Sequence, residues 1–202
     1  MNKLVKALVL VLCVVALVGG SVAGTLAWLS MKTEAVTNTF TAGNINITLT
    51  QANVLTDAKI VPGATYTVNP KVTVTAKSEK CYLFVKLDGK LGEDTTVTSG
   101  NNSLNFQSYL PYTVLTGANE WTALAGETGV YYRVVDVSTA SESAEFSILN
   151  ANTLTADNQR TKADYDALGA RSLNLSITAY AVQFNGLTNG VTEAWEIAED
   201  LS

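Results

Sequence analysis

The chain has 202 residues, a length that suits a single domain with a sizeable hydrophobic core. Only 15% of the residues are charged and the formal net charge is −5, without a basic cluster, so nucleic acid is not an expected partner. The chain contains no histidine and only two cysteines, Cys13 and Cys81. Ser-His and Cys-His catalytic arrangements are therefore excluded, and so is a framework of disulfides.

Residues 1–27 have the features of a secretory signal peptide. Lysines near the start precede a long uncharged apolar run, and small residues follow that run. Small residues at positions −3 and −1 allow cleavage after Ala23 or after Ala27. The alternative is an uncleaved anchor, because the uncharged stretch exceeds the roughly 20 residues that span a bilayer. We expect a cleaved signal and an exported protein without a membrane segment after cleavage.

The next segment, 28–40, is polar and has no sustained period. We expect it to be an N-terminal arm that is either flexible or ordered by a partner. Ile45, Ile47 and Leu49 then alternate with asparagine and threonine, a pattern typical of a half-buried strand. This first strand opens the predicted folded domain, 41–202.

Further strands follow along the chain. The run CYLFVKL from Cys81 is apolar on both faces and predicts a central strand, with a turn at Asp88-Gly89. Pro70 interrupts an alternating stretch and predicts a bend or a sheet-edge position, because proline cannot donate to a ladder. The remaining predicted elements are strands within 65–76, 130–137, 144–149 and 173–184 and short helices at 162–170 and 191–201. This pattern predicts an all-β fold: an antiparallel β-sandwich of jelly-roll or immunoglobulin-like type with one or two short peripheral helices.

The stretch 89–129 is rich in Gly, Asn, Thr and Ser, which predicts loops and short strands. Trp121 and the nearby Tyr131 are the candidates for contacting a ligand there. The acidic residues at its start do not have EF-hand spacing, so a solvated turn is preferred to a calcium site. Cys81 lies in a strand pattern and is interpreted as a buried structural thiol. We predict no catalytic, cofactor-binding or metal-binding residue, and hence a protein that is not an enzyme.

Two segments near the start of the chain carry a family resemblance. GTLAW, followed by TNTFTAGNINITL, resembles the exported proteins processed by the dedicated signal peptidase SipW, the family that includes the biofilm matrix protein TasA and camelysin. The likeness continues through PGATYTVNPKVTV and CYLFVKL to AYAVQFNG near the C-terminus. It therefore covers both ends of the chain, while the middle, about 89–170, matches little of the family.

The resemblance implies a cut between Ala27 and Trp28 and a jelly-roll-like sandwich. In the fibre-forming members, the N-terminal segment of one subunit completes a sheet of the next. By analogy, the donor segment here is the arm 28–40, whose apolar residues are Trp28, Leu29, Val36 and Phe40.

We therefore expect a secreted bacterial structural protein, extracellular or on the cell surface, that forms biofilm-matrix or cell-surface fibres by strand addition between subunits. Its expected partners are further copies of itself, the signal peptidase during export, and other matrix or cell-wall components. The alternative is a monomeric surface module for adhesion or glycan binding that uses the 89–129 loops. A camelysin-like protease is disfavoured because histidine is missing.

Overall fold

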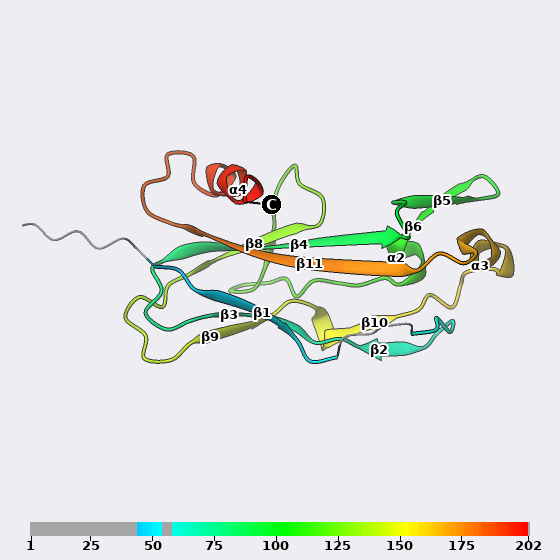
Figure 1. Ribbon diagram of the computed structural model, residues 1–202, viewed down its shortest axis with the longest axis horizontal. Helices are drawn as coiled ribbons and strands as arrows, with labels where there is room; N and C mark the ends of the chain where they lie inside the picture. Colours follow the sequence, from blue (N-terminus) through cyan, green and yellow to red (C-terminus); the bar gives the residue numbers. More distant parts are fainter. Residues whose placement is uncertain (1–43, 54–57, 202) are drawn as a thin grey trace, which may run out of the picture. The chain divides into compact units, whose positions relative to one another are not determined.

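The computed structural model describes residues 44–53 and 58–201, and this part of the chain is all-β with antiparallel sheets and few helices (Figure 1). The predicted signal peptide and arm lie outside the described residues. The described elements are β1 (Ile47–Gln51), β2 (Thr65–Thr67), β3 (Pro70–Val74), β4 (Cys81–Leu91), β5 (Thr96–Ser99), β6 (Asn102–Asn105), α2 (Phe106–Tyr109), β7 (Thr122–Ala123), β8 (Val130–Val135), β9 (Ala144–Ser147), a 3₁₀ turn (Asn150–Asn152), β10 (Thr153–Thr155), α3 (Lys162–Leu168), β11 (Leu173–Gln183) and α4 (Val191–Glu199).

The first layer is the three-stranded sheet β1-β3-β9, which the β10-β2 pair continues (Figure 1). β2 and β3 are two parts of one path that bends at Asn69, which has a φ of 43°. At this bend, the backbone N–H groups of Val68 and Asn69 both donate to the Asn152 carbonyl, at 2.9 and 3.2 Å. The predicted bend before Pro70 is confirmed, and the sheet-edge alternative is wrong because β3 lies between β1 and β9.

The second layer is the four-stranded sheet β11-β4-β8-β7. The central position predicted for CYLFVKL is confirmed, since β4 pairs with β11 on one side and with β8 on the other. The predicted turn at Asp88-Gly89 is wrong, because β4 continues to Leu91. Gly89 has a packing role instead: a Cβ there would lie 2.6 Å from Cγ of Phe106, so only glycine leaves room for that ring.

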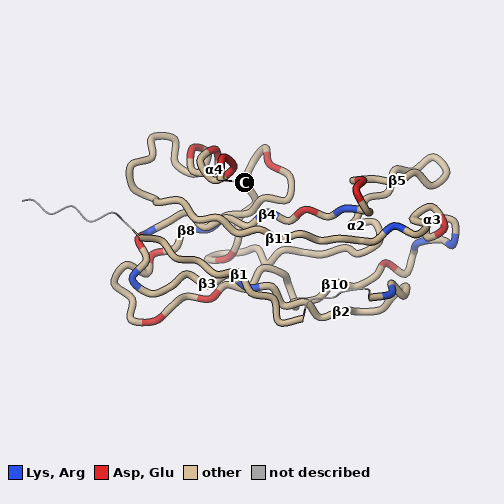
Figure 2. The backbone as a smooth tube through the Cα atoms, viewed as in Figure 1, with Lys and Arg blue, Asp and Glu red and all other residues tan. Residues whose placement is uncertain are grey.

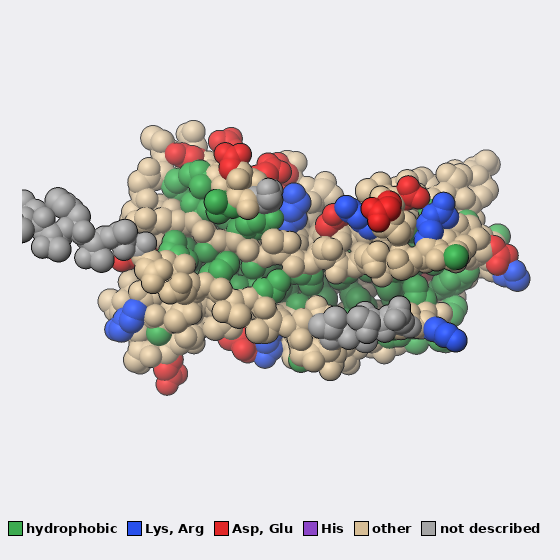
Figure 3. Space-filling view, viewed as in Figure 1, with side chains coloured by type: hydrophobic (Ala, Val, Ile, Leu, Met, Phe, Trp, Pro, Cys, Tyr) green, Lys and Arg blue, Asp and Glu red, His purple; other side chains and the backbone are tan. Residues whose placement is uncertain are grey.

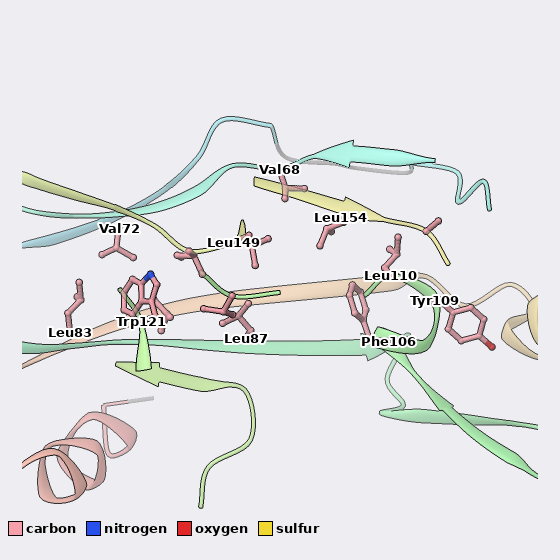
Figure 4. Close-up of a cluster of buried hydrophobic side chains, with 14 of the residues drawn as sticks. Val68, Val72, Leu83, Leu87, Phe106, Tyr109, Leu110, Trp121, Leu149 and Leu154 are labelled. Atoms are coloured by element: carbon pink, nitrogen blue, oxygen red, sulfur yellow. The ribbon is translucent and has the colours of Figure 1, made fainter. Parts of the chain in front are cut away.

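The main core lies between the two layers. Figure 4 shows Val68 and Leu154 of the first layer facing Leu87 and Phe106 on the other side. Odd-numbered residues of β4 point into this core, and even-numbered residues point to the outer face, as the period of a strand requires.

A second, smaller core lies on the outer face of the second layer, beneath α4 (Figure 1). The Trp195 ring packs 5.4 Å from the Phe84 ring and 5.8 Å from the Tyr180 ring, measured between centroids. This confirms the terminal helix predicted at 191–201, and Trp195 anchors that helix to the sheet. The helix predicted at 162–170 is α3, and it begins with a capping box between Thr161 and Asp164.

One side of the space between the layers is closed by residues 113–121. Leu115 N donates to the Ile148 carbonyl at 2.9 Å, and the Trp121 side chain fills the gap beside β9. The Arg133 guanidinium lies 3.8 Å from the Phe146 ring centroid and 5.5 Å from that of Trp121. This cation–π arrangement holds the segment against β8 and β9.

Candidate functional site

The opposite side of the two layers is bordered by β1 and β11, which are end strands of their sheets and lie beside each other. Hydrogen bonds at the two ends of β11 show which of its residues bond to β4 through their backbone. Phe184 N donates to the Lys80 carbonyl at 2.9 Å, and Gly92 N donates to the Ser172 carbonyl at 2.7 Å. Even-numbered residues of β11 are therefore the ones that bond to β4. The N–H and C=O groups of its odd-numbered residues point away from β4, into the open edge.

The same reasoning applies to β1. Thr75 N donates to the Asn46 carbonyl at 2.9 Å, so the even-numbered residues of β1 bond to β3. The backbone groups of Ile47 and Leu49 face away from β3, and no strand of the described part of the chain pairs with them. Two strand edges thus border one side of the fold, and no strand among residues 44–53 and 58–201 pairs with their outward donors and acceptors.

The inward side chains along this edge are apolar but incompletely covered. Leu173, Leu175 and Ile177 of β11 are half-buried, whereas Leu83 and Val85 on the neighbouring β4 have no exposed surface. Figure 3 shows hydrophobic side chains along the gap between the layers on this face. A further strand or ligand at this edge would remove this apolar surface from water.

The gap widens into a groove of about 750 Å³ between Gln51, at the end of β1, and α3. Its described walls combine apolar and polar residues from both layers and from α2 and α3: Gln51, Ala58, Lys59, Ile60, Tyr66, Val68, Phe106, Leu110, Leu154, Tyr165, Leu168, Gly169, Arg171, Ser172, Leu173, Asn174, Leu175 and Ile177. The groove follows β11 from Leu173 to Ile177. On the other layer its lining includes Gln51, the last residue of β1, so the groove begins where β1 ends.

The charged side chains of the described lining are basic, whereas the net charge of the chain is negative. Lys59 and Arg171 line it, and none of the described lining residues is Asp or Glu. Nε of Arg171 donates to Oδ2 of Asp94 at 3.3 Å, which holds the guanidinium at the mouth. The chain segment that carries Lys59 is positioned by Tyr66, whose hydroxyl donates to the Lys59 carbonyl at 2.8 Å. Figure 2 shows where the charged residues fall along the chain.

Aromatic residues contribute to the groove lining. Burial raises the pKa of the Tyr165 hydroxyl, which donates to the Asp157 carbonyl at 3.0 Å. The floor residue Phe106 is buried and contacts the Tyr112 ring at a centroid distance of 6.2 Å. The arrangement is suited to binding an elongated apolar group through packing, and it offers no nucleophile paired with a base.

The predicted cleavage residues and arm residues, Ala27, Trp28, Leu29, Val36 and Phe40, lie outside the described residues. The described chain begins at Asn44, whose carbonyl accepts from Glu79 N at 3.0 Å, next to the start of β4. Because β11 runs antiparallel to β4, its C-terminal end lies there, while the groove lies at its N-terminal end beside Leu173. The start of the described chain and the groove are therefore at opposite ends of β11.

The ligand-contact role predicted for Trp121 is wrong. Its side chain is 1% exposed, and its Nε1 donates to the Ser147 carbonyl at 2.8 Å. Tyr131 is half-buried and packs against the main core. An aromatic residue within a Gly- and Ser-rich stretch suggests an exposed loop, and only the hydrogen bonds to the first layer show that the loop is folded inward.

The acidic residues near the end of β4 are not gathered into a ligand set. Asp94 pairs with Arg171, and Asp88 pairs with Lys90 at 3.5 Å. Within 44–53 and 58–201, no group of three or more His, Cys, Asp or Glu side chains is arranged to hold a metal ion. The structural role of Cys81 is confirmed: it has no exposed surface, and burial, reinforced by Asp136, raises the pKa of its thiol to about 11.

The helices of the described chain are all too short or too polar to cross a bilayer. Sequence reasoning predicted the strands that contain β2 and β11 through their alternation but missed the walls from β10 and α2. These walls come from short elements whose local patterns carry little periodicity. Comparison with known proteins found no matching family model, no matching curated protein and no matching solved structure.

Proposed function

We propose that this protein is a secreted bacterial structural subunit that assembles into extracellular biofilm-matrix or cell-surface fibres by strand addition. One observation supports this proposal above all: the edges of β1 and β11 lie side by side, pair with no further strand of the described chain, and border the groove. Exposed strand edges invite pairing with another chain, and folds that do not use such edges generally protect them.

An added strand would both pair with the backbone groups of the edge and bury its apolar side chains. Its backbone would pair with the outward N–H and C=O groups of the odd-numbered β11 residues. Its inward side chains would cover Leu173, Leu175 and Ile177, which are half-buried without it. Completing that burial contributes roughly 1 kcal/mol for each side chain, about half the value for burying a fully exposed one.

The geometry favours an open polymer over a closed dimer. In this proposal the donor is the arm 28–40, with Trp28, Leu29, Val36 and Phe40 as the groups that fill the groove. Its root near Asn44 and the acceptor groove lie at opposite ends of β11. Contacts between two different surfaces of this kind join subunits head to tail, and they continue as an open filament unless the rotation between subunits closes a ring.

The remaining parts of the proposal follow from export and from the two-layer fold. The finer assignment is a jelly-roll-type sandwich, in which the chain crosses between the layers after β3, β8 and β10. Cleavage by a signal peptidase between Ala27 and Trp28 would release the arm. We propose a non-enzymatic role with further copies of the chain and other matrix or cell-wall components as partners. No observation favours the glycan-binding alternative, because its main named residue, Trp121, is buried.

The test compares the chain that begins at Trp28 with one that begins at Thr41, using negative-stain microscopy and size-exclusion chromatography. Two edge variants accompany them: Ile177→Lys, which places a charge in the groove, and the control Thr178→Lys on the exposed face of the same strand. We expect fibres from the Trp28 chain and from Thr178→Lys only. Monomers from the Trp28 chain at high concentration, or fibres from the Thr41 chain, would contradict the proposal.

A further inference from the structure

We propose that the groove beside β11 is also a binding site for an anionic amphiphile with a single alkyl chain, of which a fatty acid is the simplest example. This inference rests on the groove alone. Only its consequence for fibre assembly depends on the function proposed above.

The size and floor of the groove fit an alkyl chain. Its volume of about 750 Å³ lies within the range of roughly 300–1,000 Å³ that is usual for small-molecule sites. Its floor is made by Val68 and Leu154 of the first layer and by Phe106 and Leu110 of α2 and its C-terminal end, all of which are buried core residues (Figure 4). An alkyl chain that lies on this floor gains the free energy of leaving water.

The charge of the lining identifies the head group. The whole chain has 18 acidic and 13 basic residues, yet the described lining carries Lys59 and Arg171 and no carboxylate. Lys59 comes from the segment before β2, and Arg171 comes from the turn between α3 and β11, so each wall supplies one cation. Asp94 pairs with Arg171 but is not part of the lining. A carboxylate is attracted to this mouth, whereas a cationic head group is repelled.

The position of Arg171 orients the ligand. With the carboxylate at Arg171 and Ser172, the alkyl chain runs along Leu173, Leu175 and Ile177 toward the end of β1. These are the side chains that an added strand would cover. The amphiphile and the strand therefore exclude each other, and in the fibre-forming protein the ligand would act as an inhibitor of assembly.

Isothermal titration calorimetry of the purified chain with tetradecanoate, below its micelle concentration, tests the inference. We expect one saturable site, at least 10-fold weaker binding of tetradecyltrimethylammonium, and up to about 15-fold weaker binding of dodecanoate, because two methylene groups are lost. Lys59→Gln combined with Arg171→Gln should weaken tetradecanoate binding about 10-fold and should strengthen binding of the cationic amphiphile, because the repulsion of its head group is removed. Circular dichroism checks that each variant folds, and Lys59→Gln alone serves if loss of the Asp94 pair unfolds the double variant.

Two neighbouring variants localise the site. Leu175→Glu places a carboxylate in the groove and should abolish binding, whereas Ser176→Glu adds the same charge on the exposed face of β11 and should not. Absence of saturable binding, equal affinity for both head groups, or equal losses in the two variants would overturn the inference. Fibres that form from a chain that binds no tetradecanoate would overturn it while leaving the proposed function intact. Tetradecanoate binding by a chain that never polymerises would support it and contradict the proposed function.

Discussion

A comparison of Trp121 with Trp195 can measure how much the Trp121 hydrogen bond contributes to the stability of the β9 side of the fold. Both side chains are almost fully buried, at 1% and 4% exposure. Nε1 of Trp121 donates to the Ser147 carbonyl at 2.8 Å, whereas Nε1 of Trp195 is buried without a hydrogen-bond partner in the described chain. Replacing each tryptophan by phenylalanine removes a similar volume from a packed site. The difference between the two variants therefore reports the hydrogen bond.

We expect Trp121→Phe to lower the free energy of unfolding by about 1–3 kcal/mol more than Trp195→Phe, because it leaves the Ser147 carbonyl unpaired. Trp195→Phe removes a donor that has no partner, so only its packing loss remains. Urea unfolding followed by far-UV circular dichroism measures both variants, and unchanged m-values would show that the same surface unfolds. Equal losses in the two variants, or a larger loss at Trp195, would refute the assignment of Trp121 as a hydrogen-bonded seal.

Two further predictions concern the backbone and pH. Gly129→Ala should destabilise the fold by about 2–4 kcal/mol, because φ is +75° and the new Cβ would lie 2.4 Å from the Leu87 carbonyl oxygen. Gly100→Ala, at φ +59° with open space, should cost only about 1 kcal/mol, and thermal unfolding compares them. Two backbone N–H groups at the start of α4 hold the pKa of Glu193 below its usual value. Its stabilisation is therefore present above its unfolded pKa and lost as the pH falls through the folded pKa, so the deficit of Glu193→Gln at pH 7 should vanish in acid unfolding curves.

The local sequence pattern was sufficient to predict the strands in which apolar residues recur with a clear period. Of the alternating residues Ile45, Ile47 and Leu49, the last two lie in β1, and the run from Cys81 forms the central strand β4. The prediction of a turn at Asp88-Gly89 was wrong because a glycine within a strand does not always mark a turn. Here it lets the Phe106 ring pack closely against the backbone. The β5–β6 hairpin and α2 were not predicted as separate elements because four-residue segments are too short to show a period.

The groove illustrates a second limit of sequence patterns. Leu173, Leu175 and Ile177 show the alternation of any half-buried strand, and that pattern reports which face of the strand is buried. It does not report whether a neighbouring strand lies on each side, because lateral pairing involves backbone groups that every residue carries. The position of β11 at the end of its sheet emerged only from the pairing of β4 with both β8 and β11.

By itself, the sequence determined the all-β class, the main strands, the two peripheral helices and the absence of histidine chemistry, because these depend on composition and on periods within single segments. The tertiary structure alone decided that Trp121 closes one side of the fold, whereas on the other side no further strand among the described residues pairs with the β1 and β11 edges. It also decided that Lys59 and Arg171, more than a hundred positions apart, line one groove. Such features depend on which distant segments become neighbours, and no local pattern encodes that choice.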